Sequence, residues 1–151
     1  METDQKWYFT TKEIDNEIEK AKDIYRKAYS KGSITSGYRL AYLLEEVNNK
    51  KIGLKLESTL WKIPEAKKIF ETLSENGDNY STVDLSLYYP EASKMVRVLN
   101  LKAAIQGNAT AFNNLGIYYY QKKNIEKSKF WFKKAKEYGF ELAEEYKVLI
   151  N

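Results

Sequence analysis

Hydrophobic residues recur at helical spacing along almost the whole chain, and strand-like alternation is nearly absent. In the first such segment, apolar side chains stand three or four residues apart, at Ile14, Ile18, Ala21, Ile24, Tyr25 and Ala28. Thr10 and Glu13 have the spacing of a capping box that would begin this helix. Similar stripes predict helices over 38–47, 64–76, 83–88, 90–106, 111–120, 125–138 and 142–149. Pro64 and Pro90 each suit a first helical position. The pattern therefore predicts an all-α protein.

Four glycines stand where these helices are expected to end, at Gly32, Gly77, Gly107 and Gly139. The residues four, eight and eleven positions before each of them are small or apolar, which places them on one helix face. Eight residues after the first three glycines stand leucines, followed by a small residue: Leu40 and Ala41, Leu85 and Ser86, Leu115 and Gly116. Short side chains let two helices approach closely. The sequence thus predicts a repeated helix pair, which becomes stable when several copies stack.

The glycine spacing also divides the chain. We expect a single helical-repeat domain over 1–151, with repeat units at roughly 11–48, 64–89, 90–120 and 124–151. The first interval between glycines is the longest, which indicates an insertion at about 49–63. Short connections between the helices predict antiparallel neighbours.

The C-terminal unit resembles a known family. The residues at the spacing of the tetratricopeptide pattern are Phe112, Leu115, Gly116, Tyr119, Phe132 and Ala135, with Ser128 in place of the usual alanine. The run Trp-Phe-Lys-Lys-Ala at 131–135, followed by Gly139 and Ala143, is more similar to the Sel-one-like variant of that repeat. The resemblance covers 95–151 directly and 14–93 through less regular copies. It implies a short right-handed α-solenoid of about three to four antiparallel helix pairs.

The same resemblance implies a protein–protein interaction module whose partner, a protein or peptide, binds the concave face lined by the first helix of each pair. By position, the partner-binding candidates are Tyr38, Arg39 and Tyr42, then Asp84 and Leu87, then Asn113, Asn114, Ile117 and Tyr120. Asn and Arg side chains hydrogen-bond peptide groups, and Tyr supplies rigid contact area. The alternative is that each of these residues is a solvated or packing residue of a degenerate repeat.

The composition argues against catalysis. The chain has no Cys and no His, which excludes disulfides, thiol chemistry, imidazole ligands and His-based nucleophile activation. No calcium loop or phosphate-binding glycine loop is present. The acidic residues Glu45, Glu46, Asp78, Asp84 and Glu91 suit an acidic patch better than a catalytic pair, and ordinary surface better than either. We expect no enzyme activity, no cofactor and no metal.

The net charge of the chain is +4, and the charged residues are unevenly distributed along the sequence. Residues 64–93 carry two basic and six acidic side chains, and residues 94–151 carry eleven and five. The lysines of the C-terminal third are Lys122, Lys123, Lys127, Lys129, Lys133, Lys134 and Lys136. They lie opposite the predicted packing face, so a solvated face is favoured over a nucleic-acid-binding module, which stays the alternative function. Tyr118, Tyr119 and Tyr120 would point in three directions on a helix and cannot form one stacking platform.

No apolar stretch has the length of a signal peptide or of a membrane span, so we expect a cytoplasmic protein without membrane contact. Richness in Lys, Ile, Asn and Tyr is compatible with an AT-rich bacterial genome. Small, cofactor-free chains with such repeats resemble stand-alone bacterial members that act as immunity or regulatory proteins. An adaptor or inhibitor of this kind is the expected role.

Overall fold

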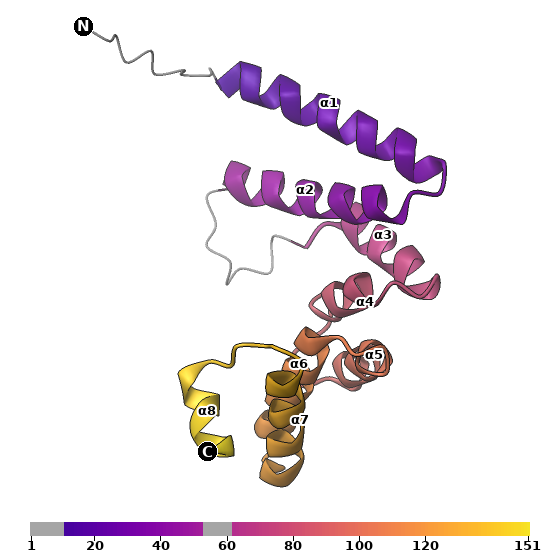
Figure 1. Cartoon of the computed structure of the whole chain (residues 1–151). Coiled ribbons are helices and arrows are strands. Elements are labelled where there is room, and N and C mark those ends of the chain that lie inside the picture. Colours follow the sequence, from indigo (N-terminus) through magenta and orange to yellow (C-terminus); the bar gives the residue numbers. More distant parts are fainter. Residues whose placement is uncertain (1–10, 53–61) are drawn as a thin grey trace, which may run out of the picture.

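The computed structural model describes residues 11–52 and 62–151 of the chain, and within these ranges all regular structure is helical (Figure 1). The helices are α1 (Thr11–Ser30), α2 (Ile34–Ile52), α3 (Pro64–Glu75), α4 (Asn79–Ser86), α5 (Lys94–Ala104), α6 (Ala109–Gln121), α7 (Ile125–Glu137) and α8 (Glu144–Ile150). Each helix packs against the next one along the chain, and the helix axes turn progressively from α1 to α7. The expected all-α stack of helix pairs is confirmed.

The helix ends follow local rules that the sequence contains. Side chains that cap the N-termini accept a hydrogen bond from the backbone N–H three residues later, at Asp78, Ser93, Asn108 and Asn124. The glycines Gly32, Gly77, Gly107 and Gly139 have φ angles of 93°, 92°, 79° and 82°. This left-handed conformation is open to glycine at little cost, which is why the repeat keeps a glycine after each of these helices.

Two hydrophobic clusters form the core, and α4 and α5 contribute to both. The first cluster joins α2, α3, α4 and α5 through buried residues that include Leu40, Phe70 and Leu85. The second joins α4, α5, α6 and α7, with Leu115 and Phe132 fully buried. The leucine that follows each glycine by eight residues is thus a core residue in all three copies. Two clusters that share helices, in place of one central core, are expected of stacked repeats.

Helices α6 and α7 approach each other closely at Gly116. A methyl group at this position would lie 2.5 Å from the ring of Phe132, which is fully buried. The hydroxyl of Ser128 donates to the Gly116 carbonyl at 2.9 Å, so α7 contacts the α6 backbone directly. Gly116 therefore lets α6 and α7 approach closely, as the repeat pattern predicted.

Several predicted boundaries were wrong. Pro90 does not begin a helix, because Ser93 caps α5 from Lys94 onward and its N–H donates back to the Pro90 carbonyl in a turn. The last helix begins at Glu144, two residues later than expected, whereas α4 begins earlier, after Asp78. Residues 49–52 of the expected insertion continue α2. Residues 53–61 and Thr10, the expected cap of the first helix, lie outside the described residues.

The apolar stripe of α1 is only partly covered. Ile14 and Ile24 are 48% and 64% exposed, although both were expected on the packing face. α1 packs mainly against α2, and among residues 11–52 and 62–151 no helix covers its other side. Tyr25 and Tyr29 supply the contacts to the first core cluster instead.

Candidate functional site

Two tyrosines on α2 lie one helical turn apart on the side that faces α4. The ring centroids of Tyr38 and Tyr42 are 5.2 Å apart and tilted by 44°. Tyr38 also meets Phe70 of α3 edge-on at 6.0 Å, which ties it to the first core cluster. Tyr42 is 50% exposed. The pair thus has an anchored member and a member that presents its ring to solvent.

α4 brings a carboxylate to these tyrosines. Its N-cap Asp78 accepts from the Ser81 N–H at 2.8 Å, which fixes the start of the helix and places Asp84 toward α2. Burial, and then the interaction with Asp84, raises the pKa of the Tyr38 hydroxyl. The charge of Asp84, followed by burial, raises the pKa of Tyr42. Both predicted α2 tyrosines therefore lie beside the predicted α4 carboxylate.

A second carboxylate and a third tyrosine complete the group. Tyr88, in the turn after α4, donates a hydrogen bond from its hydroxyl to Glu45 of α2. Its ring meets Phe70 edge-on at 6.2 Å, on the same buried ring that Tyr38 contacts. We call the five residues Tyr38, Tyr42, Glu45, Asp84 and Tyr88 the tyrosine–carboxylate cluster. Phe70 of α3 supports it from the core.

Both carboxyl groups of the cluster hold protons more tightly than free ones. Burial raises the pKa of Glu45 to about 7; the hydrogen bond from Tyr88 opposes this rise, and the charge of Asp84 adds to it. Burial raises the pKa of Asp84 to about 6, the interaction with Tyr38 opposes the rise, and the charge of Asp78 adds to it. Desolvation and mutual repulsion disfavour two carboxylates in one half-buried place. One Asp84 oxygen, Oδ2, is buried and accepts no hydrogen bond from the described residues.

Glu45 and Tyr88 were not among the predicted site residues. Glu45 was placed among ordinary acidic surface residues, and Tyr88 among the repeat's packing positions. A signal was available, because the pair Tyr88 and Tyr89 stands where the first copy has Leu43 and Leu44. Tyr in place of Leu at a packing position adds a hydroxyl that needs a partner when buried.

The other candidates do not join the cluster. Arg39 is exposed on α2, and Leu87 is 49% exposed one turn after Asp84. Asn113 is 9% exposed, and Ile117 packs against the second core cluster. The ring of Tyr120 meets Tyr146 of α8 at 5.6 Å and is 43% exposed.

Asn114 belongs to a buried polar relay that crosses three helices. Its side-chain amide donates to Asn100 Oδ1 at 3.0 Å, and the side-chain amide of Asn100 donates to Ser86 Oγ, also at 3.0 Å. Asn100 is fully buried and Ser86 nearly so. These hydrogen bonds fix α4, α5 and α6 relative to one another. Asn114 therefore stabilises the packing of the helices.

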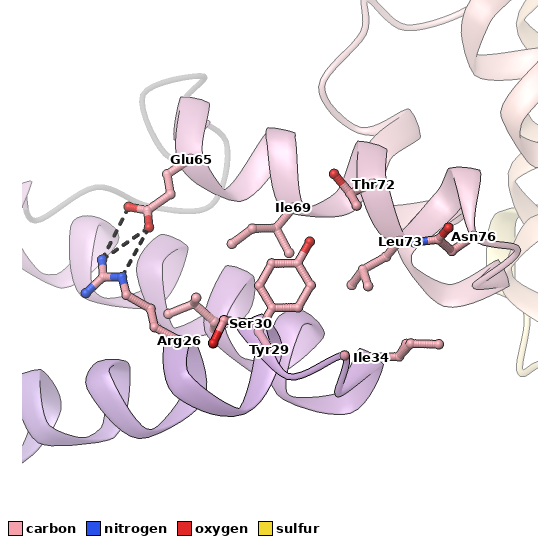
Figure 2. A pocket seen from close by; sticks show the side chains of 11 residues that line it. Arg26, Tyr29, Ser30, Ile34, Glu65, Ile69, Thr72, Leu73 and Asn76 are labelled. Atoms are coloured by element: carbon pink, nitrogen blue, oxygen red, sulfur yellow. Dashed lines mark hydrogen bonds and ion pairs between the residues drawn. The ribbon is translucent and has the colours of Figure 1, made fainter.

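A separate cavity of about 530 Å³ opens between α1, α2 and α3 (Figure 2). Its apolar wall includes Tyr29 of α1 and Ile69 and Leu73 of α3, whose side chains lie between these two helices in Figure 2. At one end Arg26 Nη2 approaches Glu65 Oε1 at 3.2 Å, and this ion pair links α1 to α3. The cavity thus lies apart from the predicted site residues.

The tyrosines of α6 beside the lysine-rich helix α7 do not form a flat stacking surface. The rings of Tyr118 and Tyr119 stand at 89° to each other, and the amines of Lys122 and Lys127 lie 5.7 and 5.3 Å from the respective ring centres.

Over residues 11–52 and 62–151 no group of three or more acidic side chains could hold a metal ion. In the same ranges no helix is long and apolar enough to cross a membrane.

No protein-family model and no curated protein matches the chain. The fold is similar to that of a protective antigen present in uropathogenic Escherichia coli strains, whose crystal structure displays a Sel-one-like repeat fold. The TM-score is 0.60 at 23% sequence identity, and the similarity covers 78% of this chain and 26% of the antigen. The chain thus spans about a quarter of that protein's length. Together with the all-helical stack, this likeness shows that the chain has the Sel-one-like repeat fold, a helical-repeat solenoid.

Proposed function

We propose that this chain is an adaptor or inhibitor that binds one protein or peptide partner through the face formed by α2, α4 and α6. It acts by binding alone, without catalysis and without a cofactor. The observation that carries the proposal is the exposure of Tyr42 within the tyrosine–carboxylate cluster, with Leu87 half exposed in the turn after α4. Aromatic side chains that a core holds in place are typical anchors of protein interfaces.

The support of Tyr42 strengthens this proposal. Tyr38 contacts both Tyr42 and the buried Phe70, so the exposed ring rests on a fixed neighbour. A side chain that is already ordered loses less conformational entropy when a partner binds. Tyr42 and Leu87 therefore suit recognition better than isolated apolar residues on a mobile surface.

Within this class, the narrower role we propose is that of a bacterial immunity or regulatory protein in the cytoplasm. The small size, the absence of Cys and His and the repeat fold support it. An immunity protein must recognise one toxin tightly, and a fixed aromatic anchor with buried charge provides such selectivity. A toxin gene beside the gene for this chain, neutralised on co-expression, is the expected observation; survival unaffected by this chain contradicts the narrower role.

The test of the general proposal is affinity capture from the native host with the wild-type chain, Tyr42→Ala and Tyr120→Ala. Phe130→Ala is the matched control, because Phe130 is an aromatic residue on α7 with 53% exposure, close to the 50% of Tyr42. Capture of the partner, identified by mass spectrometry, should fall with Tyr42→Ala and persist with Phe130→Ala. Capture unchanged in both Tyr42→Ala and Tyr120→Ala contradicts binding at this face.

A nucleic-acid-binding role for the basic C-terminal third predicts a different outcome. Phosphate contacts by lysines make binding fall steeply as salt rises. Charge reversal at Lys127, Lys129 and Lys133, together with a salt titration, separates the two functions. Partner binding that survives both changes supports the α2, α4 and α6 face.

A further inference from the structure

The α4 side of this face presents exposed apolar side chains on both sides of one carboxylate. Tyr80 and Leu87, 64% and 49% exposed, lie one turn before and one turn after Asp84, and Tyr42 of α2 is 50% exposed. Large apolar side chains gathered in this way indicate a contact surface when polar groups lie among them. The polar groups here are the carboxylates of Glu45 and Asp84.

These two carboxylates have no cationic partner among the residues that the structure describes. The ion pairs found there involve neither Glu45 nor Asp84, whose contacts are with the tyrosines of the cluster. The charge of Asp84 also acts on Glu45. The charge that acts on Asp84 is that of another carboxylate, Asp78. The face is therefore complementary to a positive charge.

We propose that an arginine side chain of the partner protein docks on this face, between the ring of Tyr42 and the carboxylates of Glu45 and Asp84. This inference rests on the proposed function and names the chemistry of its partner. A guanidinium is planar, offers several N–H donors to carboxylates and stacks on aromatic rings, and it is less strongly hydrated than an ammonium. Leu87 and Tyr80 then contact the apolar residues beside that arginine.

The buried Oδ2 oxygen of Asp84 supports this occupant. A buried carboxylate oxygen without a donor lowers the stability of the fold. A positive charge docked beside this carboxylate offsets part of that cost through its field, without a bond to the enclosed oxygen. A metal ion fits less well, because Ca²⁺ takes six to eight oxygen ligands and this part of the chain offers two carboxylates and three tyrosines.

The proton affinity of the two carboxyl groups agrees with the same occupant. An adjacent positive charge favours the ionised form, so binding should lower the raised pKa values of Glu45 and Asp84. Near neutral pH the site then releases protons as the arginine enters. A purely apolar contact would increase burial and raise these pKa values further.

The direct test is an NMR titration of the full chain with the peptide acetyl-Gly-Arg-Gly-amide. The matched probe is acetyl-Gly-Gln-Gly-amide, which has no charge. We expect saturating shifts at Tyr42 and Asp84 with the arginine peptide, and a fall in the pKa of Glu45 followed through its carboxyl carbon. Equal shifts with the glutamine peptide, or a Glu45 pKa that stays the same or rises, overturn the proposal.

Two variants keep the test specific. The double variant Glu45→Gln and Asp84→Asn removes the charge with little change in shape, and it should weaken arginine-peptide binding by about tenfold or more. The control is Glu75→Gln, at an exposed glutamate on α3, which should leave binding unchanged. Retained binding in the double variant, with circular dichroism showing a folded chain, overturns the proposal.

Affinity capture of the native partner with both variants, Tyr42→Ala and the double variant, distinguishes a failure of this inference from a failure of the proposed function. Capture lost with Tyr42→Ala and kept in full by the double variant leaves the interaction face intact and contradicts the arginine. Self-association that the double variant abolishes would identify a lysine-rich α7 of a second copy as the occupant, which also contradicts an arginine of another protein. Loss of capture in both variants is the result we expect.

Discussion

The hydroxyl of Tyr88, in the turn after α4, donates a hydrogen bond to the carboxylate of Glu45 on α2, 43 residues earlier in the chain. The two residues belong to different repeats, and α3 lies between them in the sequence. Phe70 of α3 contacts the ring of Tyr88 and that of Tyr38. The bond therefore joins successive helix pairs on the face that we assign to the partner, and it does so through a group that titrates.

Stability should rise as the pH falls from about 8 to about 5. Glu45 and Asp84 have folded-state pKa values of about 7 and about 6, above their ordinary values of 4.5 and 3.8, so the folded chain binds these protons more tightly than the unfolded chain. Protonation thus removes a destabilisation that is fully present above the folded pKa values. Both groups are partly solvated, so we expect a gain of only about 1–2 kcal/mol, measured by urea unfolding across this pH range.

The control for this pH dependence is the double variant Glu45→Gln and Asp84→Asn, which lacks both titrating groups. Its stability should change less over the same range and should exceed that of the wild type at pH 8. An unchanged slope of stability against pH would show that other groups cause the effect.

Gly116→Ala should destabilise the fold more than Gly37→Ala. The new methyl group would lie 2.5 Å from Phe132 in the first case and 2.6 Å from Tyr29 in the second. Phe132 is fully buried between α6 and α7, whereas Tyr29 is only partly buried and borders the cavity between α1 and α3. We expect a loss of about 1–3 kcal/mol for Gly116→Ala and a smaller one for Gly37→Ala, from thermal and urea unfolding. Equal losses would contradict the difference in packing.

Residues close in sequence allowed most of the fold to be predicted. The small residue at 116 and the glycines at 32, 77, 107 and 139 depend on rules that act within one or two helices, and the structure bears them out. Pro90 misled because a proline also suits a turn, and Ser93 is the stronger cap. The expected burial of Ile24 failed because periodicity identifies an apolar face without showing that a neighbour covers it.

The candidate site was predictable only in part. Position in the repeat identified Tyr38, Tyr42 and Asp84, because the helix face they share follows from their spacing. The partnership of Glu45 with Tyr88 depends on how α4 sits against α2, which no single helix encodes. Asn114 was assigned to the partner surface because nothing in its own helix indicates the buried Asn100 that accepts its hydrogen bond.

Asn100→Ala should cost about 2–3 kcal/mol of stability, because it removes a fully buried side chain and two hydrogen bonds of the relay. Asn114→Ala, at the less buried end, should cost about 1 kcal/mol, because it removes one hydrogen bond while the shorter side chain leaves room for water beside Asn100 Oδ1. The measurement is the midpoint of urea unfolding at a constant slope. If the double variant loses less than the sum of the two, the residues form one network, as the bonds indicate. A sum that is strictly additive would contradict the relay.

Lys123→Gly should leave the chain as stable or raise its stability by about 0.5 kcal/mol, whereas Lys122→Gly should lower it by a similar amount. Lys123, in the turn after α6, has a φ of 57°, a left-handed conformation that is strained for a side chain with a Cβ. Lys122 has a φ of −80° and its amine lies near the ring of Tyr118, so glycine there only adds disorder to the unfolded chain and removes a contact. The two neighbours have the same charge, so the pair isolates backbone strain from electrostatics. The measurement is the thermal unfolding of both variants. A larger loss of stability for Lys123→Gly than for Lys122→Gly would contradict backbone strain at Lys123.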